Sequence, residues 1–252
     1  MNTVRLGVVL AAFMGLILQS TDKAFDNPGD DIEKAYNELV SADHWRKAKT
    51  ASEKLGAFGD AALPVILKGT KHKTRMTREN CYEILRSKFP SHPKAIQAII
   101  DGLNDKEPMI SYPCAFHLGE KRIVKARRAL KACLKDKSKD DKTLYAAAKS
   151  LAELGEKDVM VRLYTGLGSD DHYTRYLANI GIKALCGRDL SDFGYEGPWE
   201  GAFVSGPNVV RTKGHPIEKA EKRLGRWKAI VAFLKWIEKE KPQLFKELDN
   251  LW

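Results

Sequence analysis

The sequence predicts an all-α protein in which about five helical hairpins stack in a row, followed by a loop and capping helices. Four stretches of the chain repeat a helix–break–helix pattern at a nearly fixed spacing, and their apolar residues recur at helical intervals. No strand-like alternation of polar and apolar residues competes with this pattern before residue 190. With 252 residues, 30% charged and 43% hydrophobic, the chain has the composition and length of one large globular domain or two small ones.

The first element is an apolar segment, Leu6–Leu18, which follows Arg5 and contains no charged residue. A basic start, a short apolar run and polar residues directly after it are typical of a secretory signal peptide. The run is shorter than the roughly 17–25 residues that a stable membrane-spanning helix needs. We therefore expect residues 1–20 to be a signal peptide, cleaved or kept as an N-terminal anchor, and the rest to be exported to the periplasm or the extracellular space. The alternative is an apolar helix packed on the first hairpin, and we expect no other transmembrane span.

The repeats come next, each with an Ala- or Cys-rich first helix, a break and a second helix that closes with leucine. They occupy residues 46–67, 78–103, 112–134 and 145–167, with a fifth first helix predicted at Tyr173–Leu185 and a partial leading unit at Ile32–Leu39. The closing leucines are 36, 31 and 33 residues apart, at Leu67, Leu103, Leu134 and Leu167. Because one hairpin is too small to bury its own apolar face, neighbouring hairpins must pack together and share a core.

Local signals define the hairpins further. Leu-Gly pairs at Leu55-Gly56, Leu118-Gly119 and Leu154-Gly155 predict the ends of three first helices, because glycine readily adopts the left-handed conformation that ends a helix. Four cysteines fall within apolar helical stripes, which predicts small core residues, at Cys81, Cys114, Cys133 and Cys186. Their even number in an exported chain leaves disulfides open as the alternative.

The C-terminal part begins with a loop rich in Gly, Pro and aromatic residues over residues 187–216. An amphipathic helix is predicted next, at about Ile217–Lys239, and a short last helix through Phe245 to Trp252. The predicted apolar face of the long helix consists of Ala220, Leu224, Trp227, Ile230, Val231, Leu234 and Ile237. We interpret residues 191–252 as a loop and capping helices that close the array of hairpins formed by residues 21–190.

The Ala-rich first helix, the Leu-Gly break, the second helix and the closing leucine resemble HEAT repeats, over roughly residues 41–190. The repeat length is most similar to the short HEAT-like type that phycobilin-attaching lyase subunits also contain. The succession Gly187-Arg188-Asp189 and Asp192-Phe193-Gly194-Tyr195, followed by a Trp-bearing helix, resembles the end of exported bacterial HEAT-repeat proteins. The resemblance implies an armadillo-type α-solenoid, a right-handed α-α superhelix, and implies no activity.

The chain contains few patterns that suggest chemistry. Asp192-Phe193-Gly194 spells the metal motif of kinases, but no Gly-rich phosphate loop or catalytic-loop motif accompanies it. Cys114 and His117 lie one helical turn apart without further ligands, and His117 is better explained as an inner, hydrogen-bonded residue. Asp170 and Asp171 precede a predicted helix, where acids cap the helix and complement its dipole. We therefore predict no enzyme activity, no metal and no cofactor.

Two basic clusters give the best indication of function, since neither contains an acidic residue: residues 68–78 and residues 121–135. If residues 121–135 form one helix, Lys121, Lys125 and Arg128 share a side. The candidate binding residues are Lys121, Arg122, Lys125, Arg128, Lys131 and Lys135. The family resemblance implies that second helices line the concave surface, where this strip would meet a partner. The alternative is a solvated helix face that keeps the protein soluble.

The predicted function is that of a non-catalytic binding or scaffold module outside the cytoplasm. The net charge of +10 attracts anions, so the expected partner is a protein or an anionic polymer, and export disfavours nucleic acid. Two alternatives remain open at this point. One is an enzyme of HEAT-repeat architecture, such as a chromophore lyase or a DNA glycosylase, and the other is a structural spacer.

Overall fold

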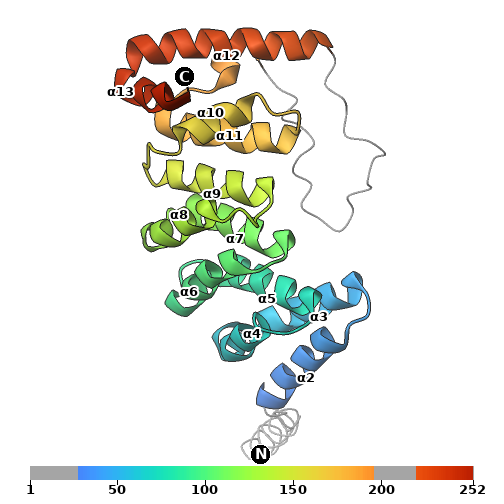
Figure 1. Ribbon diagram of the computed structural model, residues 1–252. Helices are drawn as coiled ribbons and strands as arrows, with labels where there is room; N and C mark the ends of the chain where they lie inside the picture. The colour runs from blue at the N-terminus through green and yellow to red at the C-terminus, as the bar shows by residue number, and fades with distance from the viewer. Residues whose placement is uncertain (1–27, 196–219, 252) are drawn as a thin grey trace, which may run out of the picture.

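The computed structural model describes residues 28–195 and 220–251, and this part of the chain contains helices and loops but no strand (Figure 1). The predicted all-α class is therefore confirmed. The predicted signal segment, residues 1–20, and most of the Gly- and aromatic-rich loop lie outside the described residues. None of the described helices is long and apolar enough to cross a membrane.

The described part of the chain begins with α2 (Pro28–Ser41) and continues as alternating longer and shorter helices. The longer first helices are α3 (Trp45–Ala57), α5 (Arg75–Lys88), α7 (Pro108–Glu120), α9 (Asp141–Glu153) and α11 (His172–Cys186). The shorter second helices are α4 (Leu63–Gly69), α6 (Pro93–Asp101), α8 (Arg127–Lys135) and α10 (Met160–Leu167). Single 3-10 turns precede, follow or join them: η1 (Gly59–Ala62), η2 (Gly102–Asn104), η3 (Val124–Ala126) and η4 (Leu190–Phe193).

The helices are stacked in the order of the sequence. Each first helix from α3 to α11 packs on the next first helix, and α4, α6, α8 and α10 each pack on the first helix that follows them. Figure 1 shows the resulting row, in whose lower part α3, α5 and α7 lie to the right and α4, α6 and α8 to the left. Apolar side chains from every hairpin join one continuous core, which is the arrangement required if no hairpin can bury its own apolar face.

Three small residues mark equivalent places in the hairpins. A Cβ atom on Gly69 would lie 2.3 Å from Sγ of Cys81, and one on Gly102 would lie 2.7 Å from Sγ of Cys114. A Cβ on Gly166 would lie 2.8 Å from Cβ of Ala178. In all three cases, a second helix approaches the following first helix too closely for any side chain. Cys81 and Cys114 therefore do occupy matching positions, and all four cysteines are buried free thiols.

This register corrects the alignment of the closing leucines. Leu103 and Leu167 directly follow Gly102 and Gly166 and are fully buried. The residue that follows Gly69 is Thr70, so Leu67 lies about one turn before the equivalent position. Leu67 is only partly buried. The irregular spacing of 36 residues between Leu67 and Leu103 reflects this shift.

The Leu-Gly pairs were correctly interpreted in only one of three cases. Gly155 has φ +84°, the left-handed conformation expected at a helix end. Gly56 and Gly119 instead lie inside α3 and α7. The left-handed residues after these two helices are Gly59 (φ 56°) and Arg122 (φ 49°). Gly119 is required for another reason, because a Cβ there would lie 2.5 Å from the backbone Cα of Ser150 in α9.

The C-terminal helices are α12 (Ala220–Glu240), α13 (Pro242–Phe245) and the 3-10 turn η5 (Lys246–Leu251). The long helix α12 lies across the end of the stack (Figure 1, top). Phe193 of η4 contacts it through two aromatic pairs, with ring centroids 5.7 Å from Phe233 and 5.8 Å from Trp236. Phe193 therefore fixes the segment after α11 to the terminal helix.

The predicted apolar face of α12 is partly wrong. Ile230 and Ile237 are buried as predicted, together with Ala229 and Phe233. Leu224, Trp227 and Val231 are 58%, 48% and 49% exposed. The helix is rotated so that Phe233 meets Phe193, and so that Arg226 can donate to the carbonyls of Leu167 and Ser169 at the end of α10. The helix therefore carries a second apolar face, largely exposed, beside the face that is buried in the core.

Candidate binding surface

The predicted basic strip is divided between a turn and a helix. Lys121 and Arg122 lie in the turn after α7, Lys125 lies in η3, and α8 begins only at Arg127. The amide of Ile123 donates to the carbonyl of Leu118 at 2.8 Å, and that of Arg122 to the carbonyl of Gly119 at 2.7 Å. These bonds satisfy the last carbonyls of α7 and turn the chain. The predicted continuous helix from Lys121 is therefore wrong, and only Arg128, Lys131 and Lys135 belong to α8.

Lys131 does not contribute a free charge to this surface. It forms ion pairs with Glu156 and, at 3.0 Å, with Asp158, both from the loop of the next hairpin. Arg127 reaches the same Glu156 at 2.7 Å and also donates to the carbonyl of Leu154 at 3.1 Å. Residues 121–135 contain no acidic residue in sequence, but the following hairpin places two carboxylates, Glu156 and Asp158, next to them in the structure.

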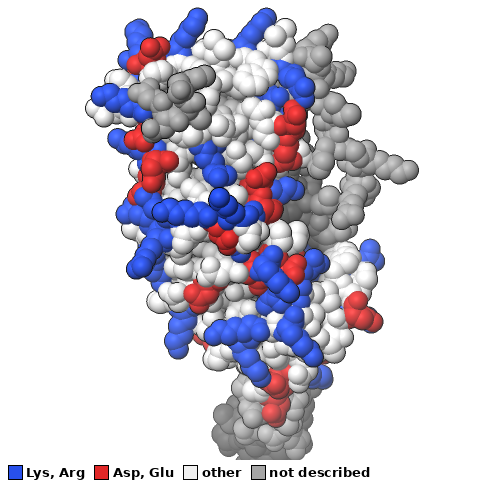
Figure 2. Space-filling model, viewed as in Figure 1, with Lys and Arg blue, Asp and Glu red and all other residues white. Residues whose placement is uncertain are grey.

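The other five predicted residues remain available. They are exposed and form no ion pair within residues 28–195 and 220–251: Lys121, Arg122, Lys125, Arg128 and Lys135. We call these five residues the α8 basic surface. Figure 2 shows blue side chains along the left edge of the molecule at the level of α8. Such a group of exposed cations on a fixed helix and turn attracts anionic groups.

The other basic cluster, residues 68–78, is largely used for packing. Arg78 forms a buried pair with Asp105 at 2.7 Å, and Arg75 lies 3.9 Å from Glu79 on the same helix. The ammonium group of Lys68 lies 5.6 Å from the ring centroid of Tyr36. Lys68, Lys71 and Lys73 are exposed without an ion pair to another described residue. This cluster therefore offers fewer available charges than the α8 basic surface.

The four cysteine thiols are buried in an unreactive state. Burial raises the pKa of the cysteine thiols, to about 12 for Cys81 and Cys114 and to about 11 for Cys133 and Cys186. Thiols with such pKa values are protonated near neutral pH and are poor nucleophiles. Among the described residues, no group of three His, Cys, Asp or Glu side chains is placed to hold a metal ion. Asp171 caps α11 as predicted, accepting from the amide of Thr174 at 2.7 Å.

His117 is buried as predicted, but the predicted hydrogen bond is missing at its Nε2 within the described part of the chain. The side chain is 6% exposed, and its Nε2 has no hydrogen-bond partner in the described part of the chain. Burial, reinforced by the nearby positive charge of Arg86, lowers the pKa of His117 to about 4. The imidazole is therefore neutral at physiological pH.

Sequence reasoning missed a buried charged pair on α9. Lys149 is 2% exposed, lies 3.7 Å from the ring centroid of Phe116 and pairs with Glu153 at 2.8 Å. Burial raises the pKa of Glu153 more than the contact with Lys149 lowers it. The only sequence signal is the spacing of four residues between the two charges in an otherwise Ala-rich helix. The pair fills the interface of α7 and α9 and borders no described cavity, so we interpret it as structural.

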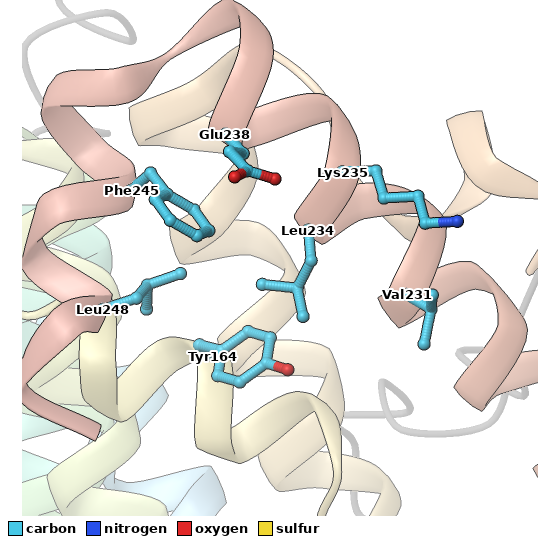
Figure 3. A pocket seen from close by; sticks show the side chains of 7 residues that line it. All are labelled: Tyr164, Val231, Leu234, Lys235, Glu238, Phe245 and Leu248. Carbon is cyan, nitrogen blue, oxygen red and sulfur yellow. The ribbon is translucent and has the colours of Figure 1, made fainter. Parts of the chain in front are cut away.

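Sequence reasoning also missed an apolar cleft at the C-terminal end, with a volume of about 240 Å³. Its walls come from three elements that are distant in sequence: Tyr164 of α10, Leu234 of α12, and Phe245 and Leu248 of α13 and η5. Figure 3 shows these four side chains around a common space, with Val231, Lys235 and Glu238 of α12 completing the lining.

No protein-family model matches this sequence, and no curated protein matches it significantly.

Proposed function

We propose that the protein is a HEAT-like α-solenoid, a right-handed superhelix that acts as a non-catalytic binding or scaffold module. It recognises an acidic protein or an anionic polymer through the α8 basic surface. The supporting observation is the set of five exposed cations, Lys121, Arg122, Lys125, Arg128 and Lys135, that no described carboxylate neutralises.

The stacked hairpins support this role physically. The core beneath the surface is continuous, with Ala126 and Leu130 fully buried directly under the basic residues. Cations fixed on such a support lose little conformational freedom when they bind, compared with cations on a flexible tail. An anionic partner gains the most electrostatic binding energy where several cations lie close together. It gains little where a carboxylate of the protein already neutralises them.

We further propose that this module works outside the cytoplasm, with residues 1–20 serving as export signal or N-terminal anchor. The proposal rests on the short uncharged run Leu6–Leu18 after Arg5. Cell fractionation of a C-terminally tagged chain tests it. A product in the exported fraction is the expected result, and an unprocessed product confined to the cytoplasm would contradict export and make nucleic acid a partner to consider.

Retention on a sulfonate resin tests the binding surface. The variant Lys125→Glu/Arg128→Glu should elute at clearly lower salt than Lys34→Glu/Lys88→Glu, which reverses two exposed lysines far from α8 and changes the net charge equally. Equal elution of the two variants would show that total charge alone governs retention, and would exclude the α8 basic surface as the binding site.

A further inference from the structure

The helix α12 has an exposed apolar stripe in addition to the face that caps the stack. Leu224, Trp227 and Val231 are 58%, 48% and 49% exposed, and the partly buried Leu234 continues the line. These residues follow one another at intervals of three, four and three, which places them along one side of an α-helix. This spacing is the one that packs against a second helix.

The stripe leads directly into the apolar cleft of Figure 3, because Val231 and Leu234 belong to both. The cleft volume of about 240 Å³ is below the roughly 300–1,000 Å³ of sites that enclose a whole small ligand. It suits one large apolar side chain, inserted as an anchor by a longer molecule that lies along the stripe.

A basic rim borders the stripe on the side away from the core. Lys228 and Lys235 are exposed, are seven residues apart and form no ion pair within the described part of the chain. On a helical projection, both lie just beyond the stripe, with the buried face of α12 on its other side. Arg223 is occupied differently, because it pairs with Asp170 at 2.6 Å. The rim therefore offers positive charge along the stripe from Lys228 to Lys235, and the exposed Glu238 marks the end of the stripe at the cleft.

We propose that this stripe and cleft bind an amphipathic helix of an acidic partner protein. The apolar face of that helix would lie on Leu224, Trp227 and Val231, with one large side chain in the cleft and carboxylates facing Lys228 and Lys235. A second copy of the chain fits less well, since antiparallel pairing of two such stripes brings the basic rims together. The site is separate from the α8 basic surface and does not depend on its role.

A pair of labelled synthetic helices provides the probe. Both carry leucines at alternating intervals of three and four residues. One has glutamates along one flank, and the other has lysines at the same places. Fluorescence anisotropy with the full chain should show binding of the Glu-flanked helix and weaker binding of the Lys-flanked one. The variant Val231→Glu should weaken binding at least about tenfold, equivalent to roughly 1.4 kcal/mol.

Two further variants make the assignment specific. Val124→Glu alters a valine in η3 that is 59% exposed, so it is a matched control and should change affinity by less than about twofold. Lys228→Glu/Lys235→Glu should reverse the preference, so that the Lys-flanked helix binds more tightly than the Glu-flanked one. Failure of this reversal would overturn the role of the rim.

Other occupants give different outcomes, and each would overturn the proposal. If a second copy covers the stripe, sedimentation will show a dimer that Val231→Glu dissociates. If a lipid surface covers it, vesicles containing anionic phosphatidylglycerol will bind in a Val231-dependent manner while neither peptide does. If the chain covers the stripe itself, Val231→Glu will lower the melting temperature markedly and neither peptide will bind.

Discussion

Arg78 binds Asp105 through two parallel hydrogen bonds, with Nε donating to Oδ2 at 2.7 Å and Nη2 to Oδ1 at 3.0 Å. The side chains are only 11% and 9% exposed, and they lie at the two ends of one hairpin, with Arg78 in α5 and Asp105 directly after η2. Nη1 of the same guanidinium donates to the carbonyls of His72 and Lys73. One side chain thus fixes the loop that precedes this hairpin to the loop that follows it.

Asp105→Asn should lower the free energy of unfolding by about 2–4 kcal/mol at pH 7, because it leaves a largely buried guanidinium without a counter-charge. Urea denaturation measures the change. Asp60→Asn, an exposed carboxylate in η1, is the control and should change stability by less than about 0.5 kcal/mol. Similar losses in both variants would show that the Arg78–Asp105 pair adds nothing beyond surface charge.

The same pair predicts a dependence on pH. Burial alone would raise the pKa of Asp105, but the hydrogen bonds from Arg78 and from the Glu107 amide outweigh it and hold this pKa below its usual value. A carboxyl with a lowered folded-state pKa contributes stability that is complete above its unfolded pKa of about 3.9 and is lost as the pH falls through the folded value. The stability difference between wild type and Asp105→Asn should therefore shrink below about pH 4. A difference that stays constant from pH 6 to pH 3 would contradict this assignment.

His117 predicts a second, separate pH window. Its folded-state pKa of about 4 lies below the value of about 6.5 expected in the unfolded chain. Between these two pH values His117 is protonated in the unfolded chain but stays neutral in the folded protein. The free energy of unfolding should therefore fall on the order of 2 kcal/mol as the pH drops from 6.5 to 4. His117→Gln should remove this decline, which urea denaturation across the range can measure. NMR titration gives an independent check, since an imidazole of His117 that titrates near pH 6.5 would be inconsistent with its burial.

Gly119→Ala should destabilise the interface between α7 and α9. The new Cβ would lie 2.3 Å from Oγ of Ser150 and 2.5 Å from its Cα, and the backbone contact cannot be relieved by rotating a side chain. The expected loss is about 2–3 kcal/mol in thermal or urea unfolding. Gly225→Ala is the matched control, because it changes a helical glycine in α12 whose Cβ would meet no atom within 4 Å. That variant should gain up to about 1 kcal/mol from helix propensity, and a comparable loss at both sites would refute the packing argument.

The hairpins themselves could be predicted from the sequence, because helical spacing of apolar residues and breaks between them are local signals. The roles of individual glycines could not. Glycine follows leucine at both Gly155 and Gly119, but for different reasons. Gly155 ends a helix in the left-handed conformation, whereas Gly119 makes room for the neighbouring helix, which the sequence of the Leu-Gly pair does not reveal. The rotation of α12 is equally non-local, since Phe193 and the carbonyls at the end of α10 decide that Phe233 turns inward and Leu224 outward.

The candidate site shows the same limit. The sequence correctly indicated a basic segment at residues 121–135, but it could not show that Glu156 approaches it from the next hairpin. The apolar cleft was missed entirely, because Tyr164, Leu234 and Phe245 are brought together only by the packing of the terminal helices. The spacing of residues within one segment indicates which of them share a helix face. Whether a charge on that face is free to bind, and whether the face borders a cleft, depends on the elements that pack beside it.

Glu156 neutralises two cations of α8. It lies 2.7 Å from Arg127 and also pairs with Lys131, so both positive charges are less available to an anionic partner. Glu156→Gln keeps the shape of the side chain and removes its charge. If the α8 basic surface binds anions, the variant should elute from a sulfonate resin at higher salt than Glu33→Gln, which removes an exposed carboxylate on α2 and changes the net charge equally. Stability should change by less than about 1 kcal/mol, because these pairs are partly solvated. Lys131 keeps its pair with Asp158 in this variant, so the released cation is mainly Arg127. Identical elution of the two variants would mean that freeing Arg127 beside the α8 basic surface adds no anion binding, which would contradict the prediction.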